Sequence, residues 1–311
     1  MICFSVVIPL YNKRNNIATT LESVLEQTFM PDEVVVVDDG STDDGAEVVR
    51  GFQMQYPIIK LIEKKNGGVC SARNVGIRSA SCGYVALLDA DDVWDKEFLA
   101  EQRRMIEDFP EAKMWGINYA EIEGGQLARF LPTGLPEHFR GYVNDYFNMP
   151  GRVSDLFCSS SVVVEKDVFD EVGYFDERIR YAEDNDMWWR IIACHRVAFF
   201  DRYMAFYQFD GENRALKRER LLKVFLPYYV DKYKPYKSKN YVFYRWVNRW
   251  CAVHIRNYYF NQKGQRNDAK IAAARLDYSV IPFKYRLLFK TPYFFGRAVY
   301  SVNNLKNKFL K

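Results

Sequence analysis

Four short apolar runs near the start of the chain constrain its fold more than any other feature of the sequence. They are Ile2–Leu10, Glu33–Val37, Ile58–Glu63 and Tyr84–Leu88. Each run is shorter than an independent helix, and nearly continuous apolar character is typical of a strand covered on both faces of a parallel sheet. Because segments with helical spacing lie between the runs, we expect an α/β fold: a mixed, mostly parallel sheet flanked by helices.

The apolar spacing also predicts where the other elements lie. Helices are expected from Ile17 to Leu25 and at 43–56, 69–79, 96–108, 166–172 and 183–192, and strands at 112–119 and 160–164. Glycines and prolines interrupt the pattern between Glu121 and Gly151, so this span is expected to form long loops. Loops of this length are uncommon unless they are functional; disorder is the alternative.

Polar side chains follow three of the predicted strands at the point where each ends. They are Tyr11-Asn12, Asp38-Asp39 and Asp89-Ala90-Asp91. Each cluster alone could be an ordinary turn or a helix cap. Ligands of open α/β sheets bind beyond the carboxyl ends of the strands, so three such clusters together predict one binding crevice.

The last cluster places three carboxylates, Asp89, Asp91 and Asp92, within four positions. If the backbone stays extended, Asp89 and Asp91 project to the same side. Carboxylates suit Mg²⁺ or Mn²⁺, although a solvated acidic turn that caps the next helix is an alternative. A calcium loop of the EF-hand type is excluded, because counting from Asp89 places Trp94 where glycine is required and Ala100 where glutamate is expected.

The glycine-rich phosphate cradles are missing from this sequence. Neither GxGxxG nor GxxxxGK[ST] occurs, and Asn66-Gly67-Gly68 is an ordinary flexible loop unless a phosphate lies near it. A bound diphosphate would therefore need other positive charge. A cation on Asp91, together with Arg73, could supply it.

Charge divides the chain into two parts. Residues 211–311 carry 23 basic and 5 acidic side chains, a local charge of +18, whereas residues 1–210 carry −14. The basic part also holds 22 of the 51 aromatic residues, with stripes at helical spacing: Phe243, Trp246, Trp250 and Val253, then Phe295, Val299, Val302, Leu305 and Phe309. Such helices can lie on an anionic membrane surface or pack within the protein. No nucleic-acid-binding module is recognisable, and we expect no nucleic acid partner.

Cysteine usage and hydropathy point to the compartment. The six cysteines are scattered, with no CxxC pair and no histidine at ligand spacing, which favours reduced thiols in the cytosol and argues against a structural zinc site. No apolar run of about eighteen residues occurs, so no transmembrane helix is expected. We expect a cytoplasmic protein, peripheral at the inner face of the cell membrane.

Five motifs in order carry a resemblance to a known family. VVIPLYN, VVVVDDGSTDD, NGGVCSARNVGIRSA, YVALLDADD and YAEDNDMWWR, all within residues 2–210, resemble the family 2 glycosyltransferases. The resemblance implies a GT-A fold and inverting transfer from a nucleotide sugar. It divides residues 1–210 into a nucleotide-sugar-binding half (1–95) and an acceptor-binding half (96–210), followed by a helical, basic, aromatic-rich C-terminal extension (211–311).

The resemblance also implies roles for individual residues. Tyr11 with Pro9 would line the uridine pocket, and Asp39 would bind the uracil. In the Asp89-Ala90-Asp91 motif, Asp91 would bind the metal and Asp89 would lie near the ribose or the metal's waters. The expected site comprises Pro9, Tyr11, Asp39, Asn66, Arg73, Asp89 and Asp91 for the nucleotide sugar, Asp91 and Asp89 for Mn²⁺ or Mg²⁺, and Asp184 as the catalytic base. Asp92 is interpreted mainly as a helix-start residue.

The sequence departs from the processive members of that family. Their QxxRW motif is matched only by Trp246-Val247-Asn248-Arg249-Trp250, with tryptophan in place of glutamine. We therefore expect a single-addition transferase that acts on a lipid-linked or surface-polysaccharide intermediate. Two alternatives are an aspartyl phosphatase of the haloacid dehalogenase type, with Asp89 as nucleophile and Asp91 as general acid, and a non-catalytic nucleotide-sugar-binding scaffold.

Overall fold

The chain forms two compact units, residues 1–214 and 215–311. The computed structural model describes residues 2–123, 126–129, 135–149, 156–179, 182–208, 226–261 and 266–290. Each unit is considered by itself.

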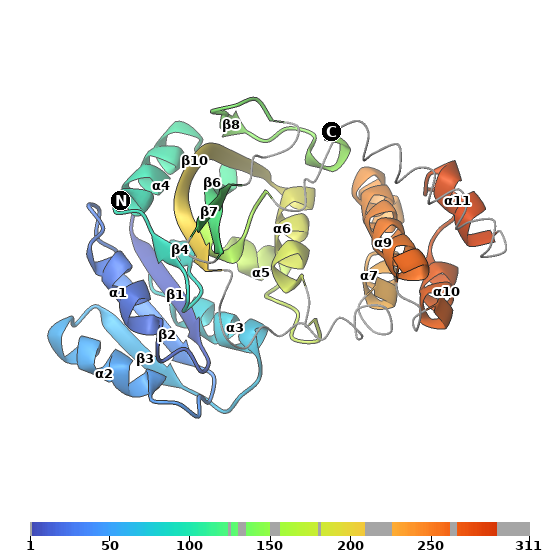
Figure 1. Ribbon diagram of the computed structural model, residues 1–311. Coiled ribbons are helices and arrows are strands. Elements are labelled where there is room, and N and C mark those ends of the chain that lie inside the picture. Colours follow the sequence, from blue (N-terminus) through green and yellow to red (C-terminus); the bar gives the residue numbers. More distant parts are fainter. Residues whose placement is uncertain are drawn as a thin grey trace. The chain divides into compact units, whose positions relative to one another are not determined.

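A mixed sheet forms the centre of the first unit (Figure 1). Four parallel strands make one half in the spatial order β3, β2, β1, β4, which are Ile59–Glu63, Glu33–Asp38, Phe4–Leu10 and Tyr84–Leu87. The connecting helices are α1 (Ile17–Leu25), α2 (Gly45–Gln55) and α3 (Val69–Ser79). The predicted alternation of strands and helices is confirmed in this half.

The second half of the sheet is mixed. Its strands follow β4 in the order β9, β6, β10, β5, which are Val162–Glu165, Ala112–Glu123, Arg196–Gln208 and Val93–Trp94. β9 runs antiparallel to β4 and β6, and β10 runs parallel to β6. The helices of this half are α4 (Phe98–Asp108), α5 (Val168–Val172) and α6 (Glu183–Cys194).

The span expected to be loops is partly regular structure. β6 continues to Glu123 and pairs with β7 (Gln126–Arg129), while β8 (Arg140–Tyr142) pairs with β10. A short 3-10 turn follows at Tyr146–Asn148. The prediction of a long loop was therefore wrong for these residues; 124–125, 130–134 and 150–155 lie outside the described part of the chain.

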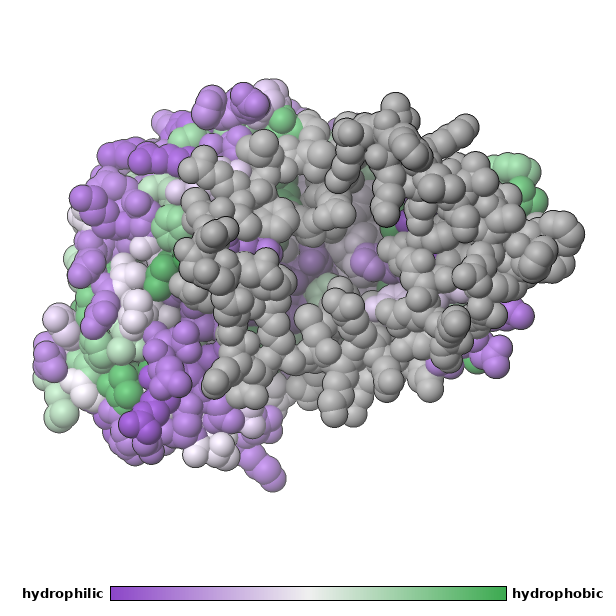
Figure 2. Space-filling model, viewed as in Figure 1, coloured by the Kyte–Doolittle hydropathy of each residue, from purple (hydrophilic) through white to green (hydrophobic). Residues whose placement is uncertain are grey.

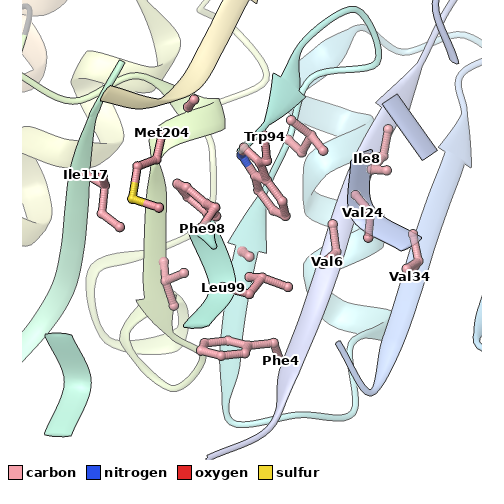
Figure 3. Packing of buried hydrophobic residues seen from close by; sticks show 14 of the residues in the cluster. Phe4, Val6, Ile8, Val24, Val34, Trp94, Phe98, Leu99, Ile117 and Met204 are labelled. Atoms are coloured by element: carbon pink, nitrogen blue, oxygen red, sulfur yellow. The ribbon is translucent and has the colours of Figure 1, made fainter. Parts of the chain in front are cut away.

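The central strands are covered on both faces, as their continuous apolar sequences predict. Alternate residues of β1 (Phe4, Val6, Ile8) join a core with α1 and α4, where Val24, Phe98 and Leu99 pack (Figure 3). The other face receives α3. A Cβ added at Gly76 would lie 2.3 Å from Val7 Cγ1, so only glycine lets this helix approach the sheet so closely.

The surface of the first unit shows few large apolar side chains. Those that are exposed are scattered: Tyr11, Met30, Met54, Tyr56 and Val69. Hydrophilic residues cover most of the described surface in the view of Figure 2.

The second unit is helical where it is described. Its helices are α7 (Leu226–Lys232), α8 (Tyr236–Lys239), α9 (Tyr241–Asn261), α10 (Arg266–Arg275) and α11 (Phe283–Lys290). The long α9 packs against α7, α8 and α10, and its buried face comprises Phe243, Val247, Cys251 and Ile255. None of the described helices has the length and hydropathy needed to cross a membrane.

The two predicted aromatic stripes have different outcomes. In the first, Phe243 is buried in the helical core, whereas Trp246, Trp250 and Val253 are only partly buried at its edge. The second, from Phe295 to Phe309, lies outside the described residues.

Candidate active site

The polar cluster after β4 forms a turn and not an extended strand end. β4 ends at Leu87, and the Asp92 amide donates to the Asp89 carbonyl at 3.1 Å. The hydroxyl of Thr20, on α1, donates to the carbonyls of Ala90 (3.0 Å) and Asp92 (2.9 Å). The Asp89 amide donates to Ser160 Oγ at 3.1 Å. The turn is therefore held by the strand behind it and by two neighbouring elements.

Asp92 does not begin a helix, so its predicted role was wrong. Its side chain is 0% exposed and accepts a hydrogen bond from the Ser160 hydroxyl, and α4 begins only at Phe98. A carboxylate can be buried here because a hydroxyl donor is held against it. Asp92 therefore stabilises the turn through its hydrogen bond to Ser160.

Asp89 and Asp91 have different cationic partners. Asp89 Oδ1 accepts a hydrogen bond from Arg73 Nη2 at 2.6 Å. Asp91 Oδ2 accepts one from Lys13 Nζ at 2.5 Å, and Lys13 lies just beyond the end of β1. Because chain connections diverge to opposite sides of the sheet between β1 and β4, these residues lie at its topological switch point.

Arg73 connects this turn to the start of α6. The side chain is 3% exposed, and its Nη1 lies 3.2 Å from Glu183 Oε1 while Nη2 binds Asp89. Its guanidinium also lies 5.4 Å from the ring centroid of Phe175. Arg73 Nε is buried and has no hydrogen-bond partner among the described residues. One donor of a buried cation thus stays available beside two carboxylates.

The segment before α6 is tied to α3, which fixes this geometry. Asn74 Nδ2 donates to the Phe175 carbonyl, and its Oδ1 accepts the Phe175 amide, both at 2.9 Å. Within α6, Asp186 pairs with Arg190 at 3.0 Å, and Arg190 also donates to the carbonyls of Val172, Gly173 and Tyr174. These contacts hold the first turn of α6 beside Arg73.

Asp184 lies in that first turn, one residue after Glu183. Ala182, which precedes the helix, has a left-handed backbone (φ 53°), a conformation that costs about 1 kcal/mol for a residue with a Cβ. Burial, followed by the charge of Glu183, raises the pKa of Asp184 to about 7, although Arg73 opposes the shift. A carboxylate with a pKa near neutrality can both accept and release a proton at physiological pH.

Asp39 holds the glycine loop that follows β3. Its Oδ1 accepts hydrogen bonds from the Gly67 amide (2.9 Å) and Lys64 Nζ (2.5 Å), and its Oδ2 accepts one from the Gly68 amide (2.6 Å). Gly40 approaches the same loop closely, since a Cβ there would lie 2.9 Å from the Asn66 nitrogen. The loops after β2 and β3 therefore form one rigid edge.

The remaining predicted residues line the same edge of the sheet. Pro9 is buried within β1, Tyr11 is exposed just beyond it, and Asn66 is exposed on the glycine loop. Asn12, next to Tyr11, has a positive φ of 50°, and its Oδ1 accepts the Thr42 amide at 2.8 Å. These contacts hold the segment that follows β1 against the loop that follows Asp39.

The donor chemistry at Asp89 and Asp91 fits a hard divalent cation. Both offer carboxylate oxygens, although Lys13 Nζ lies against Asp91 Oδ2 and a cation would have to displace it there. Within the described ranges, neither belongs to a group of three His, Cys, Asp or Glu side chains whose ligand atoms lie within 4.8 Å of one another. Water and phosphate oxygens would therefore complete the ligand set, as is usual for Mg²⁺.

Sequence reasoning missed three charged residues of this cluster: Lys13, Lys64 and Glu183. Lys13 adjoins the Tyr11-Asn12 motif and Glu183 adjoins Asp184. Their positions next to predicted site residues could therefore have identified them from the sequence. Lys64 lies just after β3, two positions before Asn66, which the resemblance had indicated.

A family model and several known proteins match part of this chain. The model of the family described as "Glycosyl transferase family 2" matches residues 5–172. The uncharacterized glycosyltransferase YibD of Escherichia coli is 34% identical over 130 residues, 42% of this chain and 38% of that protein. An uncharacterized glycosyltransferase of Rickettsia conorii is 30% identical over 211 residues, 67% of this chain and 33% of that protein. The chain thus spans only a third to two fifths of these relatives.

A solved structure matches nearly the whole of this chain. Staphylococcus aureus TarS residues 1–349, crystallised with UDP-GlcNAc, superimposes with a TM-score of 0.75 over 96% of this chain and 88% of that chain, at 22% identity. The match confirms the predicted fold, a GT-A-like mixed α/β sheet flanked by helices with a helical C-terminal region.

Proposed function

This chain belongs to glycosyl transferase family 2, and on that premise we propose that it transfers a sugar from a nucleoside diphosphate sugar, with UDP as the nucleotide, to an acceptor hydroxyl. The observation that carries the proposal is the cluster at the switch point, where Arg73 joins Asp89 to Glu183 and Asp184 follows directly. UDP is favoured because TarS, which shares the fold, was crystallised with UDP-GlcNAc.

The chemistry assigns Asp184 as the general base. The acceptor hydroxyl loses its proton as it attacks the anomeric carbon, and a carboxylate within hydrogen-bond reach contributes about 10²–10⁴-fold to the rate. Its pKa of about 7 makes it basic enough to take that proton and mostly ionised above neutral pH. Direct displacement with one base inverts the anomeric configuration, whereas retention would need a second carboxylate as nucleophile.

The leaving diphosphate needs positive charge. A bound Mn²⁺ or Mg²⁺, held by Asp91 with Asp89 nearby, would neutralise charge on the phosphate oxygens as a Lewis acid. Lys13 and Arg73 are cationic residues of this chain at the same place, and the free Nε of Arg73 can donate a hydrogen bond. Tyr11, Pro9, Asp39 and Asn66 are assigned to the nucleotide.

Residues 1–95 are assigned to the donor and 96–210 to the acceptor, which we propose is a lipid-linked or surface-polysaccharide intermediate that receives one sugar.

Contact with the inner face of an anionic membrane is favoured by α11. Phe283 and Leu287, one helical turn apart, are 73% and 49% exposed, and Lys284 and Lys290 are exposed on the same helix. Co-sedimentation with anionic vesicles should fall when residues 280–311 are removed; unchanged sedimentation would argue for packing alone.

A donor screen tests the proposed reaction. Thermal shifts should be larger for UDP and UDP-sugars with Mn²⁺ than for other nucleoside diphosphates, and Asp91→Ala should weaken the metal-dependent part. Release of UDP from the best donor should stop in Asp184→Asn, while UDP binding stays. Loss of binding together with turnover would contradict the role of Asp184. Stabilisation by UDP-sugars without any turnover would favour the non-catalytic scaffold, and hydrolysis of a simple phosphomonoester would favour the phosphatase.

A further inference from the structure

Three metal-ligating side chains meet at the amino-terminal edge of the sheet, at the opposite end of β1 from the candidate active site. Cys3 precedes β1 by one residue, Asp32 precedes β2 by one, and Cys82 precedes β4 by two. Their two sulfur atoms and one carboxylate oxygen all lie within 4.8 Å of one another. None of the three has a role in the proposed sugar transfer.

The register of the sheet brings these residues together. β1 lies between β2 and β4, with Ser5 opposite Glu33 and Phe4 opposite Tyr84. The residues just before these three strands are therefore neighbours, although Cys3 and Cys82 are far apart in sequence. A spacing rule based on short cysteine motifs does not detect such a group.

Hydrogen bonds fix the backbone around the three ligands. The Asp32 amide donates to the Phe4 carbonyl at 3.0 Å, and the Phe4 amide donates to Asp32 Oδ2 at 3.0 Å. The Cys82 amide donates to Ser5 Oγ at 3.0 Å. Because these contacts already hold the ends of the strands in place, ion binding would cost little conformational entropy.

We propose that Cys3, Cys82 and Asp32 bind one thiophilic divalent ion of the zinc class. Two sulfur ligands select Zn²⁺ and its analogues over Mg²⁺. In tetrahedral zinc sites the Zn–S distance is about 2.3 Å, which places two sulfur atoms about 3.8 Å apart. The two sulfur atoms would therefore have to move closer by about 1 Å or less to bind one ion. A water molecule would be the fourth ligand.

Binding must displace protons from the thiols. The thiolate, and not the thiol, is the form of cysteine that binds a metal ion. The ion takes the place of one proton on each sulfur, and two protons go to solvent. Affinity therefore increases with pH. Exposed Asp32 and partly exposed Cys3 leave the ion a path from solvent to buried Cys82.

Cobalt titration of the reduced full-length chain tests the site. One equivalent of Co²⁺ should produce a thiolate-to-cobalt charge-transfer band in the near ultraviolet, which Zn²⁺ removes and Mg²⁺ does not. Zn²⁺ should also raise the unfolding temperature. Cys3→Ser and Asp32→Asn should each weaken binding at least about tenfold. Cys194→Ser, which changes an exposed cysteine on α6, is the matched control and should bind as the unchanged chain does.

Three results would overturn the proposal: no charge-transfer band, a band of equal strength in Cys3→Ser, or a Cys3–Cys82 disulfide that persists in reductant. Circular dichroism of the metal-free variants shows whether each is folded. Cys3→Ser is the informative variant because Cys3 is only partly buried. Donor binding at the far end of the sheet is measured separately, so failure here does not bear on the proposed transferase activity.

Discussion

Lys13 Nζ lies 2.5 Å from Asp91 Oδ2, and this ion pair joins the ends of β1 and β4 across the switch point of the sheet. Both side chains are largely buried, with 18% and 19% of their surface exposed. The ammonium therefore occupies a face of Asp91 that the proposed divalent cation would also use, and that cation would have to compete with it.

Lys13→Met should increase the affinity for Mn²⁺, because the competing ammonium is gone. An ion pair of this exposure is worth about 1 kcal/mol or less, so an increase of about 2- to 5-fold is expected. Manganese titration followed by electron paramagnetic resonance measures it without turnover. Lys60→Met is the control, since Lys60 pairs with Glu33 at the start of β2. Equal or lower affinity in Lys13→Met would contradict the competition.

The pH dependence of transfer should follow Asp184. In the proposed reaction only the ionised carboxylate accepts the acceptor's proton, so kcat/KM should rise about tenfold per pH unit below pH 7 and level off above it. Initial rates of UDP release between pH 5 and 9 give this profile. An acidic limb near pH 4 would mean that Asp184 is not the group that titrates.

Asp184→Asn should stabilise the fold at pH 8 while it abolishes transfer. Between its ordinary pKa of 3.8 and about 7, the folded state binds more protons at Asp184 than the unfolded state does. Stability therefore falls as pH rises through this range, and the ionised group costs about 4 kcal/mol above it. Chemical denaturation at pH 8 should show the gain, and the gain should shrink towards pH 4. Asp44→Asn, at an exposed site, should show neither effect.

Arg73→Gln should move the acidic limb of the rate profile above pH 7, because the positive charge of Arg73 lowers the pKa of Asp184. It also leaves Asp89 and Glu183 without their cation, which should cost about 3–5 kcal/mol of stability. If that variant does not fold, Arg73→Lys keeps the charge but loses the two-armed contact. Arg78→Gln, on the exposed side of the same helix, should change stability by about 0.5 kcal/mol or less.

Gly76→Ala should destabilise the first unit by about 1–3 kcal/mol, because its Cβ would lie 2.3 Å from Val7 Cγ1. Gly51→Ala is the matched control within a helix. It meets no atom within 4 Å, so helix propensity alone should stabilise it by up to about 1 kcal/mol. The unfolding temperatures of the two variants separate the effect of a steric clash at position 76 from the effect of helix propensity. Equal stability of the two would show that α3 can shift away from β1.

The parallel half of the sheet was predictable because its strands are buried on both faces. Their apolar runs can be recognised as strands from the local sequence alone, without knowledge of the neighbouring strands. The helix α3 has the predicted bounds of Val69–Ser79. β10 was not predicted. Its sequence carries polar residues, and its pairing with β6 is interrupted between Phe200 and Ala205. β5 has only two residues, too few for any periodicity.

The sequence indicated where the candidate site lies, but not the contacts that its side chains make. Strand ends and the family resemblance indicated Asp39, Asp89, Asp91 and Asp184, but the partners come from distant segments. Glu183 is 110 positions from Arg73, and Ser160, whose hydroxyl donates to Asp92, is 68 positions from it. Short-range patterns assigned Asp92 to a helix start because an acidic residue before a helix is the common case. Its burial is set by tertiary packing.

Arg73 binds Asp89 with one arm and Glu183 with the other, and this has a thermodynamic consequence. A donor or cation that binds Asp89 would change the strength of the electrostatic interaction between the Arg73 guanidinium and the carboxylates of Glu183 and Asp184 at the start of α6. Donor occupancy and the proton on Asp184 are then linked quantities. By reciprocity, if binding shifts the pKa of the base, pH near 7 must shift the affinity for the donor by the same free energy. With the proposed activity, the chain would thus take up or release a fraction of a proton each time a donor binds, before any bond to the sugar is broken.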